Sequence, residues 1–180
     1  MMKKMMAAAV VLLLVTVVPA VRAEFGIGGG IYYNRQLGDL KNDKVRDFDK
    51  DFVSYVLSLK YQFASVLGLE GNLDYYNGSG TIDYTLRPMG TAVLSIPLPV
   101  FDLFNAGVGI NSTYTKFKEA GGTKGEWSKL SYHFKAGVQL PVADILWICG
   151  DCYYFVDDLK DIEDFNSDLL TFGARALLRF

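Results

Sequence analysis

The chain has 180 residues, of which 18 are Lys or Arg and 20 are Asp or Glu, so its formal net charge is −2 at pH 7. This length suits a single domain. The weakly acidic balance excludes the polybasic surface of a nucleic-acid-binding protein, and we expect no nucleic acid among its partners.

The first 23 residues have the three-part order of a secretory signal peptide. Lys3 and Lys4 precede an apolar run at residues 7–18, and small residues ending at Ala23 offer a cleavage site. The apolar run is shorter than the ~20 residues that a membrane-spanning helix needs. We therefore predict that residues 1–23 are a cleaved signal peptide.

Eight segments of the remaining chain alternate between apolar and polar residues, with the period of two that indicates β-strands. In chain order they occupy residues 25–33, 53–63, 67–75, 82–96, 104–113, 130–140, 146–156 and 170–180. No apolar run in this part is long enough for a spanning helix. A membrane location would therefore require a closed barrel, because hydrocarbon offers no partner to an unpaired backbone group. We predict one all-β domain at residues 24–180, an eight-stranded antiparallel up-and-down transmembrane β-barrel.

The connections between these segments alternate in length. Those at 64–66, 97–100 and 141–144 are short, and residues 77–80 form a tight turn. Three others are long and charged, at residues 35–50, 115–129 and 157–168. Short turns at one end and longer loops at the other are typical of outer-membrane barrels. The long loops are the candidate sites for an external ligand.

A soluble lipocalin-like barrel also alternates, but with its apolar face inward. Three features favour the membrane. The polar face is rich in Gly, Ser, Thr and Asn and poor in Lys and Glu, unlike a solvated surface. Many aromatic residues lie near strand ends, where membrane barrels carry interfacial girdles. The chain also ends on its last strand, at Phe180.

The last segment places Phe172, Leu178 and Phe180 on one apolar face. This ending resembles the assembly signal of bacterial outer-membrane β-barrels. Together with the signal peptide and the strand pattern, it makes residues 24–180 similar to the small eight-stranded barrels of the OmpA transmembrane domain, OmpX and Opa-like group of the porin family. The resemblance implies an integral protein of the bacterial outer membrane. It also implies contact with outer-membrane lipids and with the barrel assembly machinery.

Six charged residues fall on the polar face of the segments: Lys60, Glu70, Arg87, Lys135, Asp151 and Arg175. Counting residues from each turn places them in two basic–acidic–basic rungs, Lys60–Glu70–Arg87 and Lys135–Asp151–Arg175. Opposite charges across neighbouring strands are favourable, and charges removed from water need partners. The lumen of an eight-stranded barrel is only wide enough for side chains to fill. We predict that the two rungs are an interior ion network that plugs the barrel.

The single histidine, His133, lies two positions from Ser131 on the same face. The spacing invites comparison with barrel enzymes that remove acyl chains from lipid A with a His-Ser pair. The local order does not match that motif, and a catalytic pair needs a third group to orient it. We expect an interior polar histidine near Asn111 and no catalytic residue.

Cys149 and Cys152 have a spacing that sends them to opposite faces of a strand. A zinc site would need more ligands, and a disulfide within one straight strand has poor geometry. We expect two free thiols, with no metal and no cofactor.

Three functions remain open at this level. The first is a non-enzymatic barrel with a plugged interior, acting through its surface loops in envelope stability or adhesion. The second is a narrow channel for small or hydrophobic solutes, similar to OmpW-type barrels. The third is a lipid A-modifying enzyme, for which only Ser131 and His133 could serve.

Overall fold

The computed structural model describes residues 24–34, 53–63, 66–78, 81–97, 103–119, 122–159 and 166–180. The predicted signal peptide at residues 1–23 and the loop at 35–50 lie outside the described residues, as does part of the loop at 157–168. Within the described ranges, no helix is long and apolar enough to cross a membrane.

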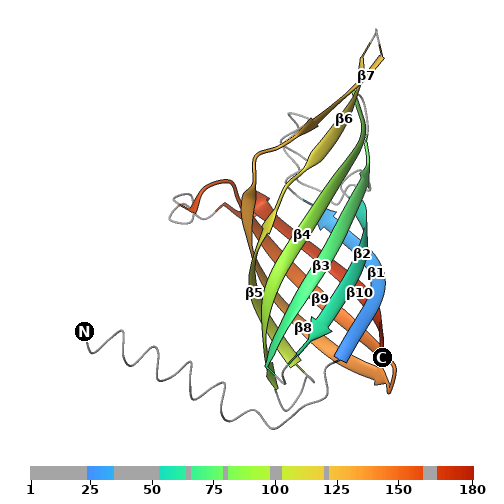
Figure 1. The fold of residues 1–180 in the computed structure, drawn as a ribbon, viewed down its shortest axis with the longest axis vertical. Helices are drawn as coiled ribbons and strands as arrows, with labels where there is room; N and C mark the ends of the chain where they lie inside the picture. Colours follow the sequence, from blue (N-terminus) through green and yellow to red (C-terminus); the bar gives the residue numbers. More distant parts are fainter. Residues whose placement is uncertain are drawn as a thin grey trace, which may run out of the picture.

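Ten strands are present among the described residues (Figure 1). In chain order they are β1 (Glu24–Asn34), β2 (Val53–Gln62), β3 (Leu67–Asn77), β4 (Ile82–Pro97), β5 (Leu103–Asn111), β6 (Tyr114–Glu119), β7 (Gly122–Trp127), β8 (Ser131–Ala143), β9 (Leu146–Val156) and β10 (Leu170–Arg179). A short 3-10 helix, η4 (Ser167–Leu169), precedes β10. Each predicted segment contains one strand, and β6 and β7 are additional.

Strands β1–β5 and β8–β10 form a closed antiparallel barrel, which confirms the predicted fold class. Each strand pairs with its neighbours around the ring, and β3 pairs with β4. The ring closes between the first and last strands, where Gly30 lies opposite Arg175. The amide of Phe180 donates to the carbonyl of Phe25 at 2.8 Å, so both ends of the barrel sequence lie at the same rim.

Strands β6 and β7 form a hairpin within the segment predicted as a long loop at 115–129. The first part of β4 pairs with β6, with Thr85 opposite Thr115, and the rest of β4 pairs with β5. The hairpin therefore continues the wall beyond one rim of the barrel, as Figure 1 shows. We call β6, β7 and the part of β4 that pairs with β6 the extension, and this rim the outer rim. The segment predicted as a long, charged loop is thus a hairpin, because its two halves pair with each other.

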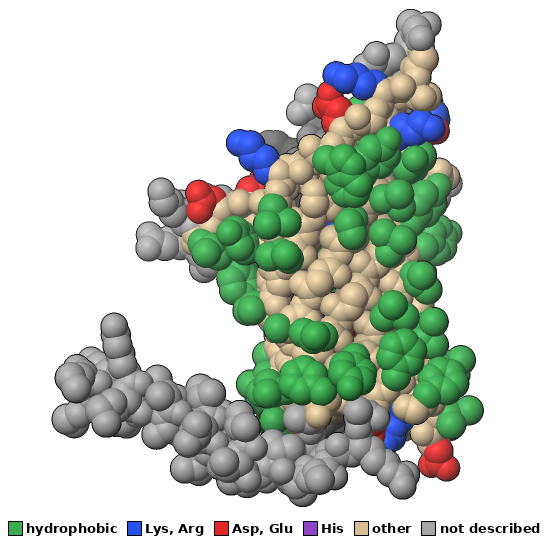
Figure 2. All heavy atoms as spheres, viewed as in Figure 1, with side chains coloured by type: hydrophobic (Ala, Val, Ile, Leu, Met, Phe, Trp, Pro, Cys, Tyr) green, Lys and Arg blue, Asp and Glu red, His purple; other side chains and the backbone are tan. Residues whose placement is uncertain are grey.

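Burial is the reverse of that in a soluble barrel. Polar side chains such as Ser58, Asn72 and Gln139 are buried in the interior, whereas apolar side chains such as Leu57, Leu69 and Val108 are exposed on the wall. Figure 2 shows hydrophobic side chains over the wall and charged ones towards the ends. A wall with so much exposed apolar surface needs an apolar surrounding or a partner. The lipocalin-like arrangement is therefore excluded, because it would place the apolar face inward.

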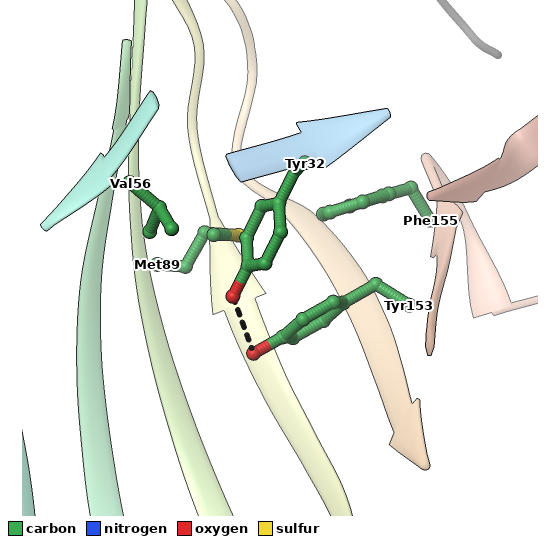
Figure 3. Packing of buried hydrophobic residues seen from close by; sticks show 5 residues of the cluster. All are labelled: Tyr32, Val56, Met89, Tyr153 and Phe155. Atoms are coloured by element: carbon green, nitrogen blue, oxygen red, sulfur yellow. Dashed lines mark hydrogen bonds between the residues drawn. The ribbon is translucent and has the colours of Figure 1, made fainter. Parts of the chain in front are cut away.

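Aromatic and apolar side chains also fill part of the interior. Tyr32, Val56, Met89, Tyr153 and Phe155 form one buried cluster (Figure 3). The hydroxyl of Tyr32 donates to that of Tyr153 at 3.4 Å, and the two ring centroids lie 5.5 Å apart. The Tyr32 ring has room in the lumen because the residue opposite it on β10 is Gly173. A Cβ atom at Gly173 would overlap the tyrosine ring. The cluster packs rings across the lumen from β1 to β9.

Candidate functional site

Glu70 on β3 is the centre of the interior charges. Its carboxylate lies 2.5 Å from the Lys135 ammonium, 3.2 Å from the Arg175 guanidinium and 3.9 Å from the Lys60 ammonium. Asp151 on β9 joins the same group, at 3.0 Å from Lys135 and 2.6 Å from Arg175. All five side chains are almost fully buried. They form one network that spans the lumen and joins Lys60 and Glu70 of one predicted rung to all three residues of the other.

Neutral groups complete this network. The Arg175 guanidinium donates to Ser58 at 3.1 Å and to Asn72 at 2.9 Å. The Lys60 ammonium donates to the side-chain carbonyl of Gln139 at 2.7 Å. Charges in a low-dielectric interior are tolerated when such hydrogen bonds accompany their ion pairs. The arrangement suits a structural plug across the middle of the barrel.

The strand register differs from the predicted one on the β8–β9–β10 wall. Lys135 lies opposite Tyr153 and Asp151 lies opposite Gly173, each two residues from the predicted partner. An irregularity between Pro141 and Ala143 shifts the β8–β9 pairing. The predicted contacts of Asp151 still form, because long side chains reach diagonal neighbours on the same face of a sheet.

The predicted contact between Glu70 and Arg87 is wrong. Glu70 lies opposite Thr91, whereas Arg87 lies opposite Asp74 and its guanidinium is 2.6 Å from that carboxylate. The β3–β4 pairing places Asn77 opposite Tyr84, so it is displaced towards the C-terminus relative to the turn predicted at residues 77–80. Arg87 therefore sits nearer the outer rim. It also donates to Asn34 at 2.5 Å, and its guanidinium lies 4.0 Å from the centre of the Phe155 ring.

Ser131 and His133 both point into the barrel, but each bonds to another residue. The Ser131 hydroxyl donates to the Asn111 side chain at 3.2 Å. His133 Nε2 lies 2.8 Å from the Thr91 hydroxyl, and His133 Nδ1 lies 3.3 Å from Asn111 Nδ2. The histidine is fully buried beside the rings of Tyr153 and Phe155. This is the geometry of an interior polar residue near Asn111, as the sequence predicts.

The two cysteines are free thiols. Cys149 is buried in the interior beside Trp147 and Leu177, and Cys152, an odd number of positions away, is partly exposed. Among the described residues, no three His, Cys, Asp or Glu side chains are grouped closely enough to hold a metal ion.

The three residues of the predicted assembly signal lie on the outer wall, where Phe172, Leu178 and Phe180 are exposed.

Tyr75, Tyr84, Tyr114 and Trp127 form an aromatic row across β3, β4, β6 and β7, with centroids 5.2–6.1 Å apart. The sequence did not predict this row, because two of its rings lie on β6 and β7.

The extension also carries charged pairs. Lys116 and Lys118 on β6 each lie 3.7 Å from Asp83, and Lys124 lies 2.5 Å from Glu126. These pairs are partly exposed, and such pairs contribute little to stability. They give the extension a polar surface above the apolar wall.

Comparison with known proteins identifies a class by fold. Neither a family model nor a curated protein sequence matches the chain. Solved structures of small eight-stranded outer-membrane barrels do match it in fold. The N-terminal β-barrel domain of Pseudomonas aeruginosa OprF superposes with a TM-score of 0.55 at 9% identity, covering 88% of this chain and 97% of that one.

Two more barrels are similar. Neisserial surface protein A matches with a TM-score of 0.53 at 10% identity, covering 87% of this chain and 93% of that one. Ail, the attachment invasion locus protein of Yersinia pestis, matches in its complex with the heparin analogue sucrose octasulfate. That match has a TM-score of 0.53 at 19% identity and covers 88% of this chain and 97% of that one.

Proposed function

We propose that this protein is an integral barrel of the bacterial outer membrane that acts through its extension in adhesion or another surface interaction, without catalysis. The apolar wall and the fold shared with outer-membrane barrels support the location. The name of Ail, an attachment invasion protein with the same fold, supports a role in surface contact. In this location the wall contacts outer-membrane lipids, and the barrel assembly machinery recognises the Phe172, Leu178 and Phe180 ending.

The observation that carries the proposal is the free edge of β7. Within the part of the chain that the structure describes, β7 pairs with β6 on one side and with no strand on the other. All of its residues are exposed. An unpaired strand edge offers backbone donors and acceptors to an extended segment of another protein. The extension places this edge beyond the outer rim, where a partner can reach it.

The filled interior favours this function over a channel. The five-residue network, the aromatic cluster and the Asp74–Arg87 pair are all buried inside the lumen. A narrow channel would need a continuous path past all three. A role in envelope stability is compatible with the same plug, since it requires no open path.

Removal of the extension tests the proposal. Thr115 lies directly opposite Glu126, so residues 116–125 can be replaced by Asn-Gly, the sequence that favours a two-residue hairpin turn. We expect cells that display this variant to lose adherence to matrix-coated surfaces and to one another, relative to cells displaying the wild type. The barrel itself should keep its β-sheet circular dichroism. Equal adherence of the two cell types at equal display would contradict the proposal.

A further inference from the structure

A cavity of about 500 Å³ opens at the outer rim, between the Asp74–Arg87 pair and the extension. Its volume falls within the range of small-molecule sites. Its lining comes from strands far apart in the sequence, including Asn34 on β1, Asp74 on β3 and Trp127 on β7. The barrel therefore holds a small-molecule-sized space above its plug, separate from the free edge of β7.

A row of polar side chains crosses four strands along this cavity. Tyr76 lies opposite Thr85, Thr85 opposite Thr115, and Thr115 opposite Glu126. All four line the cavity. The pairing of β4 with β6 brings these hydroxyls and the carboxylate together, although they are spread over 51 positions in the sequence.

Two buried oxygens in the cavity wall lack hydrogen-bond partners among the described residues. They are Asp74 Oδ1 and Thr85 Oγ1, in side chains whose residues are only 4% and 5% exposed. The other oxygen of Asp74 accepts from Arg87 at 2.6 Å. A buried polar atom without a partner costs about 1–3 kcal/mol. A ligand that donates hydrogen bonds would satisfy both oxygens.

The charges around the cavity determine whether a cationic, neutral or anionic hydrogen-bond donor would bind there. Its lining includes three carboxylates, from Asp74, Glu126 and Asp157, against one cation, Arg87, which is paired with Asp74. The Glu126 carboxylate has Lys124 beside it at 2.5 Å, but that pair is more than half exposed and screened by solvent. An anion would meet repulsion here, and a cation would be attracted.

The aromatic lining suits an organic cation. Tyr76 and Phe117 border the same space, and ring faces attract ammonium and guanidinium groups while their carbon atoms pack against alkyl chains. We propose that the cavity binds a small organic cation that bears an ammonium or guanidinium group. Its charged head donates to Asp74 Oδ1 and Thr85 Oγ1, and its alkyl part lies against Phe117. This site does not depend on the role of the β7 edge.

Calorimetric titration of the refolded protein in nonionic detergent with spermidine tests the site. We expect saturable binding of one spermidine per barrel. Thr85→Val keeps the shape of the side chain and removes its hydroxyl, so the affinity should fall about tenfold. Asp157→Asn removes an exposed charge and should weaken binding about threefold. Asp144→Asn is the matched control, because it removes the same charge in the β8–β9 turn at the opposite rim.

Competing ligands complete the test. Neutral sorbitol and anionic sucrose octasulfate should bind at least tenfold more weakly than spermidine, because neither supplies a cation to the carboxylates. A blocked trilysine peptide that binds more tightly than spermidine would identify a protein side chain as the source of the cation. Weaker binding of the peptide would identify a free amine.

Three results would overturn the proposal: no spermidine binding, equal or tighter binding of sorbitol or sucrose octasulfate, or unchanged affinity in Thr85→Val. Circular dichroism of each variant establishes that the barrel has folded. The surface role proposed for the extension would be unaffected by these results, since it is measured by adherence.

Discussion

At the scale of single residues, Glu70 determines the balance of charge inside the barrel. Three cations lie within 4 Å of its carboxylate, and Asp151 is the other acid of the network. Glu70→Gln would leave Lys60, Lys135 and Arg175 facing one acid in a buried setting. Breaking buried ion pairs in this way costs about 3–5 kcal/mol. We expect that loss in the free energy of unfolding, measured by urea titration in lipid vesicles.

The control for Glu70→Gln is Lys60→Met. The Lys60 ammonium lies 3.9 Å from Glu70, the longest ion pair of the network, and its removal brings the charges into balance. Its cost should therefore be smaller than that of Glu70→Gln. An equal cost for the two variants would show that the network does not depend on its central acid.

The partner of Arg87 can be tested by double-mutant cycles. Asp74→Asn combined with Arg87→Met should give a coupling energy of about 1–3 kcal/mol, because the two groups are paired and buried. Glu70→Gln combined with Arg87→Met should be additive to within about 0.5 kcal/mol. Coupling between Glu70 and Arg87, with none between Asp74 and Arg87, would make Glu70 the partner of Arg87, as the sequence predicted. It would also contradict the observed register of β3 and β4.

At the scale of elements, the strands approach closely where the interior carries glycine. Gly109 on β5 lies between Thr91 on β4 and His133 on β8, and the histidine reaches across it to bond to the Thr91 hydroxyl. A Cβ atom at Gly109 would overlap both the His133 ring and the carbonyl oxygen of Gly90. Gly109→Ala should therefore destabilise the barrel by about 1–3 kcal/mol.

Gly71 provides the matched control, because a Cβ atom there meets nothing within 4 Å. Gly71→Ala should leave the free energy of unfolding unchanged or raise it by up to about 1 kcal/mol, since alanine restricts the unfolded chain. Urea titration of the two variants under the same conditions measures the difference. Equal destabilisation by both substitutions would contradict the close packing of β4, β5 and β8.

At the scale of the whole molecule, the filled lumen predicts that the barrel does not conduct. We expect the refolded wild type to be silent in planar bilayers. Lys135→Ala should introduce a leak, because Lys135 bridges Glu70 and Asp151 and its loss leaves two acids around an open space. Lys60→Ala should have the same effect to a smaller extent. Single-channel recording measures both.

Lys116→Ala is the control for conductance, because Lys116 lies on the extension and pairs with Asp83 outside the network. It should remain silent. Steady conductance of the wild type would instead favour a narrow solute channel and would count against a plugged barrel.

The sequence by itself determined the class of fold and the two faces of most barrel strands. Alternation is a local property, because successive side chains of a strand point to opposite faces. Leu57, Ser58 and Lys60 could therefore be assigned to the wall or the interior without any knowledge of their neighbours. The pairing of Lys60 with Glu70 also followed from the sequence, because only a short turn separates their strands.

Only the tertiary structure decided which charges meet across the lumen. Lys135 and Glu70 lie 65 positions apart and come into contact because the barrel closes, which no single turn reveals. Arg87 pairs with Asp74 and not with Glu70 because the turn between β3 and β4 is slightly displaced from its predicted position. A displaced turn changes the register along the whole strand, and so changes every partner on it. The cavity at the outer rim likewise depends on β6 and β7, whose residues carry too weak an alternation to predict strands. Local alternation decided which side chains face the wall and which face the interior. Barrel closure and strand register decided which interior side chains touch.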